Sequence, residues 1–313
     1  MKLVITGALG HIGSSLIHSL RPGECREVIL IDNLSAQRLQ ALFRLPEGIR
    51  WRFIEADVAS ADAGLDEIFS DAHAVVHLAA VTDAESSFGN EERVDSVNFS
   101  GTERVARACV AAGCRLLFPS STSVYGVSHD GVAEDCPQEQ LKPQSPYAES
   151  KLRAERMLAE LGRTAGLRFF CGRFGTIYGP SVGMHFHTAV NRFIWQACLG
   201  KPMTVWRTAL EQRRPYLDLG DAVEAIRFVI REDLFDGGTY NVATDNLTVQ
   251  QIVEAICRHV PGARVELVDR RIMNQLSYAV DRAKFEAAGF RFAGDLERGI
   301  GDTVKLLAPL VQR

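Results

Sequence analysis

The stretch MKLVITGALGHIG, residues 1–13, decides the fold of this chain. An apolar, β-branched run leads directly into glycines at positions 7, 10 and 13, and a helical pattern follows. In a strand–turn–helix unit of this kind, glycines let backbone amides approach a pyrophosphate, whose charge is met by the helix N-terminus. A tight turn that binds nothing could carry the same glycines, but their place behind the first strand predicts a dinucleotide site. Its expected residues are Gly7, Gly10, His11, Ile12 and Gly13.

Short apolar runs alternate with longer helical patterns through the first half of the chain. The runs are LVIT at 3–6, EVILID at 27–32, WRFIEADV at 51–58, AVVHLAA at 74–80 and RLLFPSS at 115–121. This alternation is typical of βαβ units, in which helices cover both faces of a parallel sheet. Beyond about residue 173 the alternation becomes irregular. We predict an α/β fold: a Rossmann-like doubly wound parallel sheet over 1–172, and a smaller mixed α/β domain over 173–313, some segments of which return to the first domain.

Composition excludes several classes of protein. A chain of 313 residues with 46% hydrophobic residues can bury a full core, and its net charge of -4 gives no basic surplus for nucleic acid. The seven cysteines show neither CxxC pairs nor zinc-ligand spacing, so we expect reduced thiols and no metal site. No apolar run reaches membrane-spanning length, and the N-terminus lacks an export signal. These features predict a cytoplasmic protein without a nucleic-acid or membrane partner.

Polar residues close the second and third strand-like runs. Asp32 lies about twenty residues beyond the glycine turn, where a carboxylate can accept hydrogen bonds from an adenosine ribose and repel a 2′-phosphate. The sequence therefore favours NAD over NADP, with Asn33 as a neighbouring contact. Asp57 could face the adenine, although an aspartate that begins a turn explains it almost equally well. The other cofactor contacts expected at these carboxyl ends are Val58, Leu78, Ala79 and Ala80.

The segment SPYAESK, residues 145–151, places a phenol beside an ammonium. If Pro146 opens a helix, Tyr147 and Lys151 lie one turn apart on the same face. Ordinary helix surface has this spacing too, so the pair alone decides nothing. Further along, TVQQIVEAICRHV at 248–260 begins with Thr248 and Gln251 in capping-box spacing and is predicted to be a helix.

Six motifs together identify a resemblance: the glycine turn, DN at 32–33, HLAA at 77–80, SSTSVYG at 120–126, YAESK at 147–151 and RFGTIYGP at 173–180. In order and spacing the chain resembles the extended short-chain dehydrogenase/reductase family, in particular its NAD-dependent nucleotide-sugar epimerases and dehydratases. The resemblance implies that 1–172 binds NAD and 173–313 mainly binds substrate. It implies that Tyr147 is the acid/base, that Lys151 holds the nicotinamide ribose and lowers the pKa of the phenol, and that Ser121 completes the catalytic triad. It also implies a structural Asn98.

The resemblance extends to the substrate half through scattered positions. Arg214 occupies the place of a diphosphate-binding arginine, although Pro215 follows it where aspartate is usual. Thr176 stands where many relatives have asparagine. His185 and His187 have no assigned role. The substrate contacts implied by the resemblance are Ser121, Thr122, Thr176, Asn191, Arg214 and Arg271.

The residues after the catalytic hydroxyl suggest the reaction. Relatives that dehydrate or decarboxylate have acidic side chains there, whereas this chain has Thr122 and Ser123, which cannot supply a further acid or base. Epimerisation of a nucleotide-diphosphate sugar at C4, through a transient keto-sugar, is therefore the leading prediction. The alternatives are a reductase, dehydrogenase or dehydratase of a nucleotide sugar or a smaller hydroxy or keto compound, and, less favoured, a non-catalytic NAD-binding protein. The resemblance further implies a homodimer joined through helices at 91–112 and 147–161.

Overall fold

The computed structural model describes residues 1–126, 131–269 and 277–307. Its main feature is a seven-stranded sheet with the order β11-β7-β5-β4-β1-β2-β3, in which every neighbouring pair is parallel. The strands are β1 (Lys2–Thr6), β2 (Glu27–Asp32), β3 (Arg50–Glu55), β4 (Ala74–His77), β5 (Arg115–Ser121), β7 (Phe169–Phe174) and β11 (Thr239–Val242). The sheet confirms the predicted Rossmann-like α/β class.

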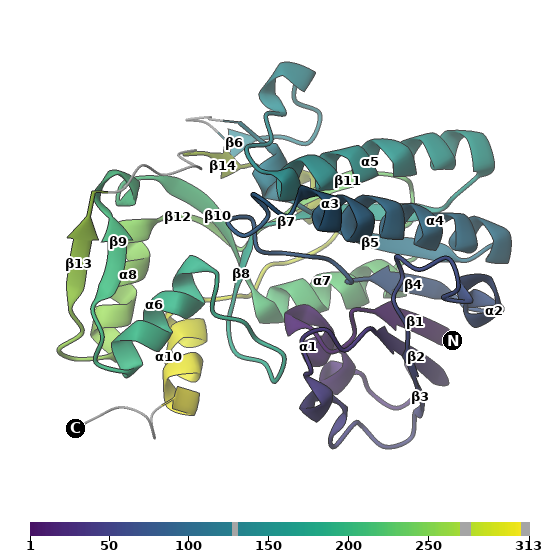
Figure 1. Ribbon diagram of the computed structural model, residues 1–313, viewed down its shortest axis with the longest axis horizontal. Coiled ribbons are helices and arrows are strands. Elements are labelled where there is room, and N and C mark those ends of the chain that lie inside the picture. The colour runs from purple at the N-terminus through teal and green to yellow at the C-terminus, as the bar shows by residue number, and fades with distance from the viewer. Residues whose placement is uncertain (127–130, 270–276, 308–313) are drawn as a thin grey trace.

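Helices cover both faces of this sheet (Figure 1). Alternate side chains of β1 divide between the two faces: Leu3 and Ile5 join one core cluster, and Val4 joins the other. The first cluster packs under α1 (His11–Ser19), α7 (Leu219–Arg231) and α9 (Ala283–Ala287). The second packs under α2 (Leu65–Phe69), α4 (Gly101–Ala112) and α5 (Pro146–Ala165). Buried strands of this kind need continuous apolar runs, as the sequence has.

A smaller lobe stands beside the large sheet (Figure 1). Its three-stranded mixed sheet has the order β12-β10-β8, with β10 parallel to β8 and antiparallel to β12. Helices α6, α8 and α10 and the strand pair β9 and β13 enclose a third core. A further pair, β6 and β14, is parallel. The bounds are β6 (Gly131–Val132), β8 (Thr176–Tyr178), β9 (Met203–Trp206), β10 (Arg213–Asp218), β12 (Asp245–Thr248), β13 (Val265–Val268), β14 (Ala279–Val280), α3 (Glu91–Val94), α6 (Ala189–Cys198), α8 (Val249–His259) and α10 (Leu296–Leu307).

Helix ends follow the local sequence. At α5, the Ser145 hydroxyl accepts a hydrogen bond from the Ala148 amide at 3.2 Å, Pro146 fills the first turn, and Gly166 ends the helix with a φ of 70°. At α8, both bonds of the capping box between Thr248 and Gln251 are present, as predicted. Each cap satisfies backbone groups that a helix end leaves unpaired.

The order of the strands creates the place for a site. The chain runs outward from β1 to β2 and β3, and then crosses to the other side of β1 to form β4. At such a switch point, the loops after neighbouring strands turn in opposite directions and leave a crevice at the carboxyl ends. Within the described ranges, no helix is long and apolar enough to cross a membrane.

Candidate active site

The glycine turn after β1 packs directly against the end of β4. Gly7 has a φ of 64°, and a Cβ added there would lie 2.6 Å from the Ala79 nitrogen. A Cβ on Gly13 would lie 2.6 Å from the carbonyl oxygens of Gly7 and Ala8. Only glycine can occupy both positions, because any side chain would meet backbone. The turn therefore brings the N-terminus of α1 to the crevice.

Asp32, at the end of β2, braces this turn. One carboxylate oxygen accepts the Leu9 amide at 3.1 Å, and the other accepts the Leu34 amide at 3.0 Å. Asp57, at the next strand end, accepts the Asn33 side-chain amide at 3.1 Å and the Ala59 amide at 2.9 Å. Asp57 thus begins a turn and also borders the crevice, while a contact with adenine stays a prediction.

A cavity of about 520 Å³ opens at these strand ends. It is lined by 18 of the 20 residues predicted to bind cofactor or substrate or to act in catalysis, which come from both halves of the chain. They are Gly7, Gly10, His11, Ile12, Gly13, Asp32, Asn33, Asp57, Val58, Leu78, Ala79, Ala80, Ser121, Thr122, Tyr147, Lys151, Thr176 and Arg214. The two exceptions are Asn191 and Arg271. Arg271 lies outside the described residues.

Tyr147 and Ser121 both line this cavity. Ser121 ends β5 and Tyr147 lies in the first turn of α5, where the Ser121 hydroxyl is close enough to lower the pKa of the Tyr147 phenol. The Ser121 hydroxyl also accepts the Ser123 amide at 3.1 Å and lies 2.8 Å from the Ser123 hydroxyl. Burial raises the pKa of Tyr147 from 10.0 to about 12, and the hydrogen bond from Ser121 opposes that rise. A serine and a tyrosine that face one cavity can together pass a proton to or from one substrate oxygen.

Lys151 lies one turn after Tyr147 and is buried. Its ammonium donates to the Pro119 carbonyl at 2.8 Å and stands 4.5 Å from the centre of the Phe118 ring. Burial lowers the pKa of Lys151 from 10.5 to about 8. The pKa of the Tyr147 phenol is raised overall, because burial outweighs the effect of Ser121, and the expected lowering by Lys151 stays a prediction.

The substrate side of the cavity differs from expectation at Asn191. This side chain is fully buried, donates to the His185 carbonyl at 3.1 Å and does not line the cavity. The predicted substrate contact of Asn191 is not seen among the residues that line the cavity, and it stays a prediction. Thr188 and Arg192, one turn apart across the start of α6, line the cavity instead. Thr188 and Arg192 are four residues apart, which is the spacing of side chains on one face of a helix. The sequence alone did not show which face of α6 turns toward the cavity, so this spacing did not identify them.

Two tyrosines complete the substrate side. Tyr278 hydrogen-bonds Arg214, and its phenol lies 3.4 Å from the Thr122 hydroxyl. Tyr216, on β10, also lines the cavity. No short motif marks either residue, because they reach the cavity only through the packing of the smaller lobe.

Asn98 is a structural residue, as the resemblance implied. It lies in a π-helical turn, Asp95–Ser100, that precedes α4. Its side chain accepts the Val81 amide at 2.8 Å and donates to the Val81 carbonyl at 2.9 Å. Asn98 therefore fixes the loop after β4, which forms one wall of the cavity.

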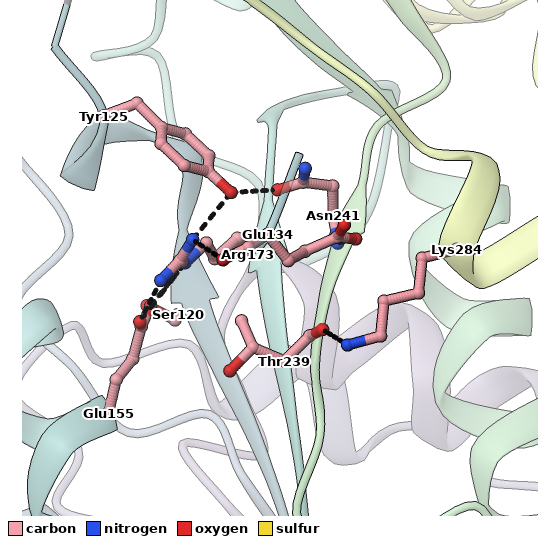
Figure 2. A network of polar contacts seen from close by, with 8 residues as sticks. All are labelled: Ser120, Tyr125, Glu134, Glu155, Arg173, Thr239, Asn241 and Lys284. Carbon is pink, nitrogen blue, oxygen red and sulfur yellow. Dashed lines mark hydrogen bonds and ion pairs between the residues drawn. The ribbon is translucent and has the colours of Figure 1, made fainter. Parts of the chain in front are cut away.

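A network of buried polar side chains joins α5 to the large sheet (Figure 2). Glu155 on α5 and Arg173 on β7 form an ion pair at 2.7 Å, with exposed fractions of 7% and 4%. Glu155 also accepts the hydroxyl of Ser120, the neighbour of Ser121. Arg173 donates to the Tyr125 phenol at 2.7 Å, and that phenol donates to Asn241 on β11 at 2.8 Å. The network thus joins α5, β5, β7 and β11 just below the cavity.

Three comparisons with known proteins agree with this geometry. The sequence matches the NAD dependent epimerase/dehydratase family over residues 3–243. It is 28% identical over 313 residues to a trifunctional UDP-glucose 4,6-dehydratase/UDP-4-keto-6-deoxy-D-glucose 3,5-epimerase/UDP-4-keto-L-rhamnose-reductase of Arabidopsis thaliana, covering 97% of this chain and 46% of that protein. The chain thus spans about half the length of that relative.

Two further similarities cover most of both chains. An uncharacterized UDP-glucose epimerase of Bacillus subtilis is 31% identical over 271 residues, which are 82% of this chain and 81% of that protein. The structure of the UDP-glucose 4-epimerase of Thermus thermophilus in complex with NAD superposes with a TM-score of 0.82 at 25% identity, covering 98% of this chain and 99% of the other. With its glycine turn, its serine–tyrosine pair and this match over most of its length, the chain belongs to the NAD-dependent epimerase/dehydratase family.

Proposed function

We propose that the protein is an NAD-dependent epimerase that inverts C4 of a nucleotide-diphosphate sugar. The observation that carries the proposal is that Ser121 and Tyr147 line the same cavity as the glycine turn, with Ser121 close enough to act on the Tyr147 phenol. Proton transfer at one oxygen is needed when a secondary alcohol becomes a ketone and when it is reformed. A protein that only bound the cofactor would have no use for that pair.

The residues of the cavity fit NAD, the cofactor of the family. Backbone atoms fill the space beside Gly7 and Gly13, so the tightly packed turn holds the N-terminus of α1 at the cavity, where its backbone amides can meet phosphate groups. Asp32 presents a carboxylate beside this turn, which suits an adenosine ribose and disfavours a 2′-phosphate. Lys151 would hold the nicotinamide ribose. When bound, NAD takes up a hydride from the sugar and returns it.

The chain's own residues handle the proton. The Tyr147 phenol oxygen takes the proton of the substrate hydroxyl and gives it back when the ketone is reduced, while the Ser121 hydroxyl donates a hydrogen bond to that substrate oxygen. Because the pKa of Tyr147 is about 12, the phenol needs nearby positive charge to act as a base near neutral pH. Lys151 is the candidate source, since it lies one helical turn away.

The neighbours of Ser121 favour epimerisation over dehydration. The Thr122 hydroxyl faces Tyr278 at 3.4 Å, and the Ser123 hydroxyl lies 2.8 Å from that of Ser121. Neither side chain can serve as the additional acid that expels a hydroxyl group. Arg214 and Arg192 both line the substrate side of the cavity, which suits a substrate with a diphosphate.

The organisation of the molecule is part of the proposal. We assign NAD binding to residues 1–172 and mainly substrate binding to 173–313, with segments of the second part returning to the first. The side-by-side packing of α4 and α5 on one face of the large sheet suits a homodimer in which these helices meet their copies (Figure 1). The absence of CxxC spacing among the cysteines suits a cytoplasmic protein.

The test follows the deuterium label, the mass of the product and the absorbance of reduced nicotinamide in one reaction. Purified protein is incubated, without added cofactor, with nucleotide sugars that carry deuterium at C4. We expect an isomer of unchanged mass that keeps its deuterium, without accumulation of reduced nicotinamide. A product lighter by one water would indicate a dehydratase. A stoichiometric requirement for added NAD or NADH would indicate a dehydrogenase or reductase and would refute epimerisation.

A further inference from the structure

Residues 179–183, which we call the strap, lie across the glycine turn although they are far away in the sequence. The strap follows β8 and leads toward α6. The His11 ring nitrogen Nε2 donates to the Gly179 carbonyl at 2.8 Å, and the Ser181 hydroxyl donates to the His11 carbonyl at 3.0 Å. Two hydrogen bonds thus hold the first residue of α1 from opposite sides.

Ser14, one turn along α1, adds a second point of attachment. Its hydroxyl accepts the Gly183 amide at 3.0 Å and lies 3.2 Å from the Ser181 hydroxyl. Between these bonds the two backbones touch: a Cβ added to Gly183 would lie 2.3 Å from the Leu9 carbonyl oxygen and 2.4 Å from that of Gly10. The strap is therefore seated on the turn without room for a side chain.

His11 is a neutral ring because it is buried, although its bond to Gly179 favours the charged form. Because Nε2 donates to a carbonyl, the other ring nitrogen, Nδ1, is the unprotonated one, and it has no partner among the described residues although His11 is only 6% exposed. Burial lowers the pKa of His11 to about 4, so the ring stays neutral near pH 7. The attachment is thus independent of pH in the neutral range.

The strap connects the two sides of the cavity. Its near end fixes the peptide units at the start of α1, and the chain continues through His185 and Thr188, which line the cavity, into α6. By contrast, Ser14, Ser181 and Gly183 do not line the cavity. They can influence a bound cofactor only through the conformation of the turn.

We propose that the strap is a positioning device that holds the glycine turn in its binding conformation and so slows the release of NAD. A turn that is already ordered loses less conformational freedom when it binds phosphates, and release requires that ordered contacts loosen. NAD is the cofactor of the family. Slow release of NAD serves the protein only under the proposed function, because an epimerase must retain its reduced cofactor until the keto-sugar has been reduced again.

The experiment measures cofactor release directly, without any sugar. Protein loaded with NADH is mixed with excess NAD⁺, and the loss of bound-NADH fluorescence gives the dissociation rate. Ser14→Ala should release NADH about fivefold faster than the unchanged protein, as expected when one or two hydrogen bonds are lost. Ser19→Ala is the matched control: Ser19 is on the same helix, and its hydroxyl donates only to the Leu16 carbonyl, at 2.7 Å.

A double-mutant cycle tests whether the attachment acts as a unit. Ser181→Ala should accelerate release like Ser14→Ala, and the double variant should show less than the product of the two effects, because both serines serve one contact. Gly183→Ala forces the two backbones apart. It should accelerate NADH release by about tenfold or more, which exceeds the effect of either serine variant. If it does not fold, the serine variants decide the question.

Two results would overturn the strap proposal. One is an unchanged rate in Ser14→Ala and Ser181→Ala, whatever happens to their melting temperatures, which would make the strap a brace of the fold alone. The other is an equal acceleration in Ser19→Ala, which would indicate general loosening of α1. Neither measurement involves turnover. A failure of the epimerase assignment therefore does not affect this test, and a failure of the strap proposal does not affect the epimerase assignment.

Discussion

Tyr147 is the residue on which the proposed chemistry depends most. Replacing Tyr147 with phenylalanine removes one oxygen and hardly any surface, so binding of NADH should change by less than about twofold. Turnover should fall by about 10²- to 10⁴-fold, the usual loss when an acid/base group is removed. Tyr240→Phe is the control, since the Tyr240 phenol bonds Asp236 and does not line the cavity. Near-normal turnover in Tyr147→Phe would contradict the assignment.

Lys151 should make stability depend on pH. Its pKa is about 8 in the folded protein and 10.5 in a free side chain, so between these values the unfolded chain binds more protons than the folded one. The free energy of unfolding should therefore gain a stabilising contribution as pH rises from 8 to 10. The measurement is the difference in unfolding free energy between the unchanged protein and Lys151→Met across that range. If this difference in unfolding free energy stays constant or shrinks as pH rises, a lowered pKa of Lys151 is excluded.

The sequence predicts some single residues well and others poorly, for physical reasons. Tyr147 and Lys151 lie one turn apart in α5, so helical spacing places them on one face, whereas Ser121, at the end of β5, was predicted from the family resemblance. Asn191 was predicted to contact substrate but does not line the cavity, because adjacent residues of a helix point about 100° apart and the register of α6 depends on its packing in the smaller lobe. The raised pKa of Tyr147 follows from burial, which no local pattern encodes.

Among the elements, α5 and β7 depend on each other through the buried pair of Glu155 and Arg173. Arg173→Met should lower the free energy of unfolding by about 3–5 kcal/mol, because it leaves a buried carboxylate without its partner. The matched control is Glu160→Gln, which breaks the exposed pair of Glu160 and Arg163 on the same helix and should have little effect. Denaturant unfolding of both variants checks the prediction. Equal losses in the two would show that burial of the pair contributes nothing.

Elements were predictable to the extent that their signals are local. The strands β1 to β5, the proline-led start of α5 and the capping box of α8 follow from adjacent residues. The strap and the parallel pair β9 and β13 do not, because their partners are distant in the sequence and are chosen by the tertiary fold. Long-range backbone contacts of this kind leave no periodic pattern to find.

At the scale of the whole molecule, the homodimer is the prediction to test. In an isologous interface each change occurs twice, so reversing the charge of one exposed residue on α5 should separate the copies. We expect light scattering at micromolar concentration to give twice the mass of the chain, and Arg156→Glu to give a monomer. Arg44→Glu, exposed in the loop before β3, is the control and should stay dimeric. A monomeric unchanged protein would contradict the proposed interface.

The place of β11 at the edge of the large sheet has a consequence for synthesis on the ribosome. All six residues of β7 are buried, and β11, made much later, pairs with its outer side. Until residues 239–242 emerge, the nascent chain exposes an apolar strand edge, which favours pairing with other chains. A protein truncated after Phe235 should therefore aggregate or require a chaperone, which sedimentation after translation in a purified system can measure. A soluble, compact fragment would show that the unpaired edge of β7 does not cause aggregation.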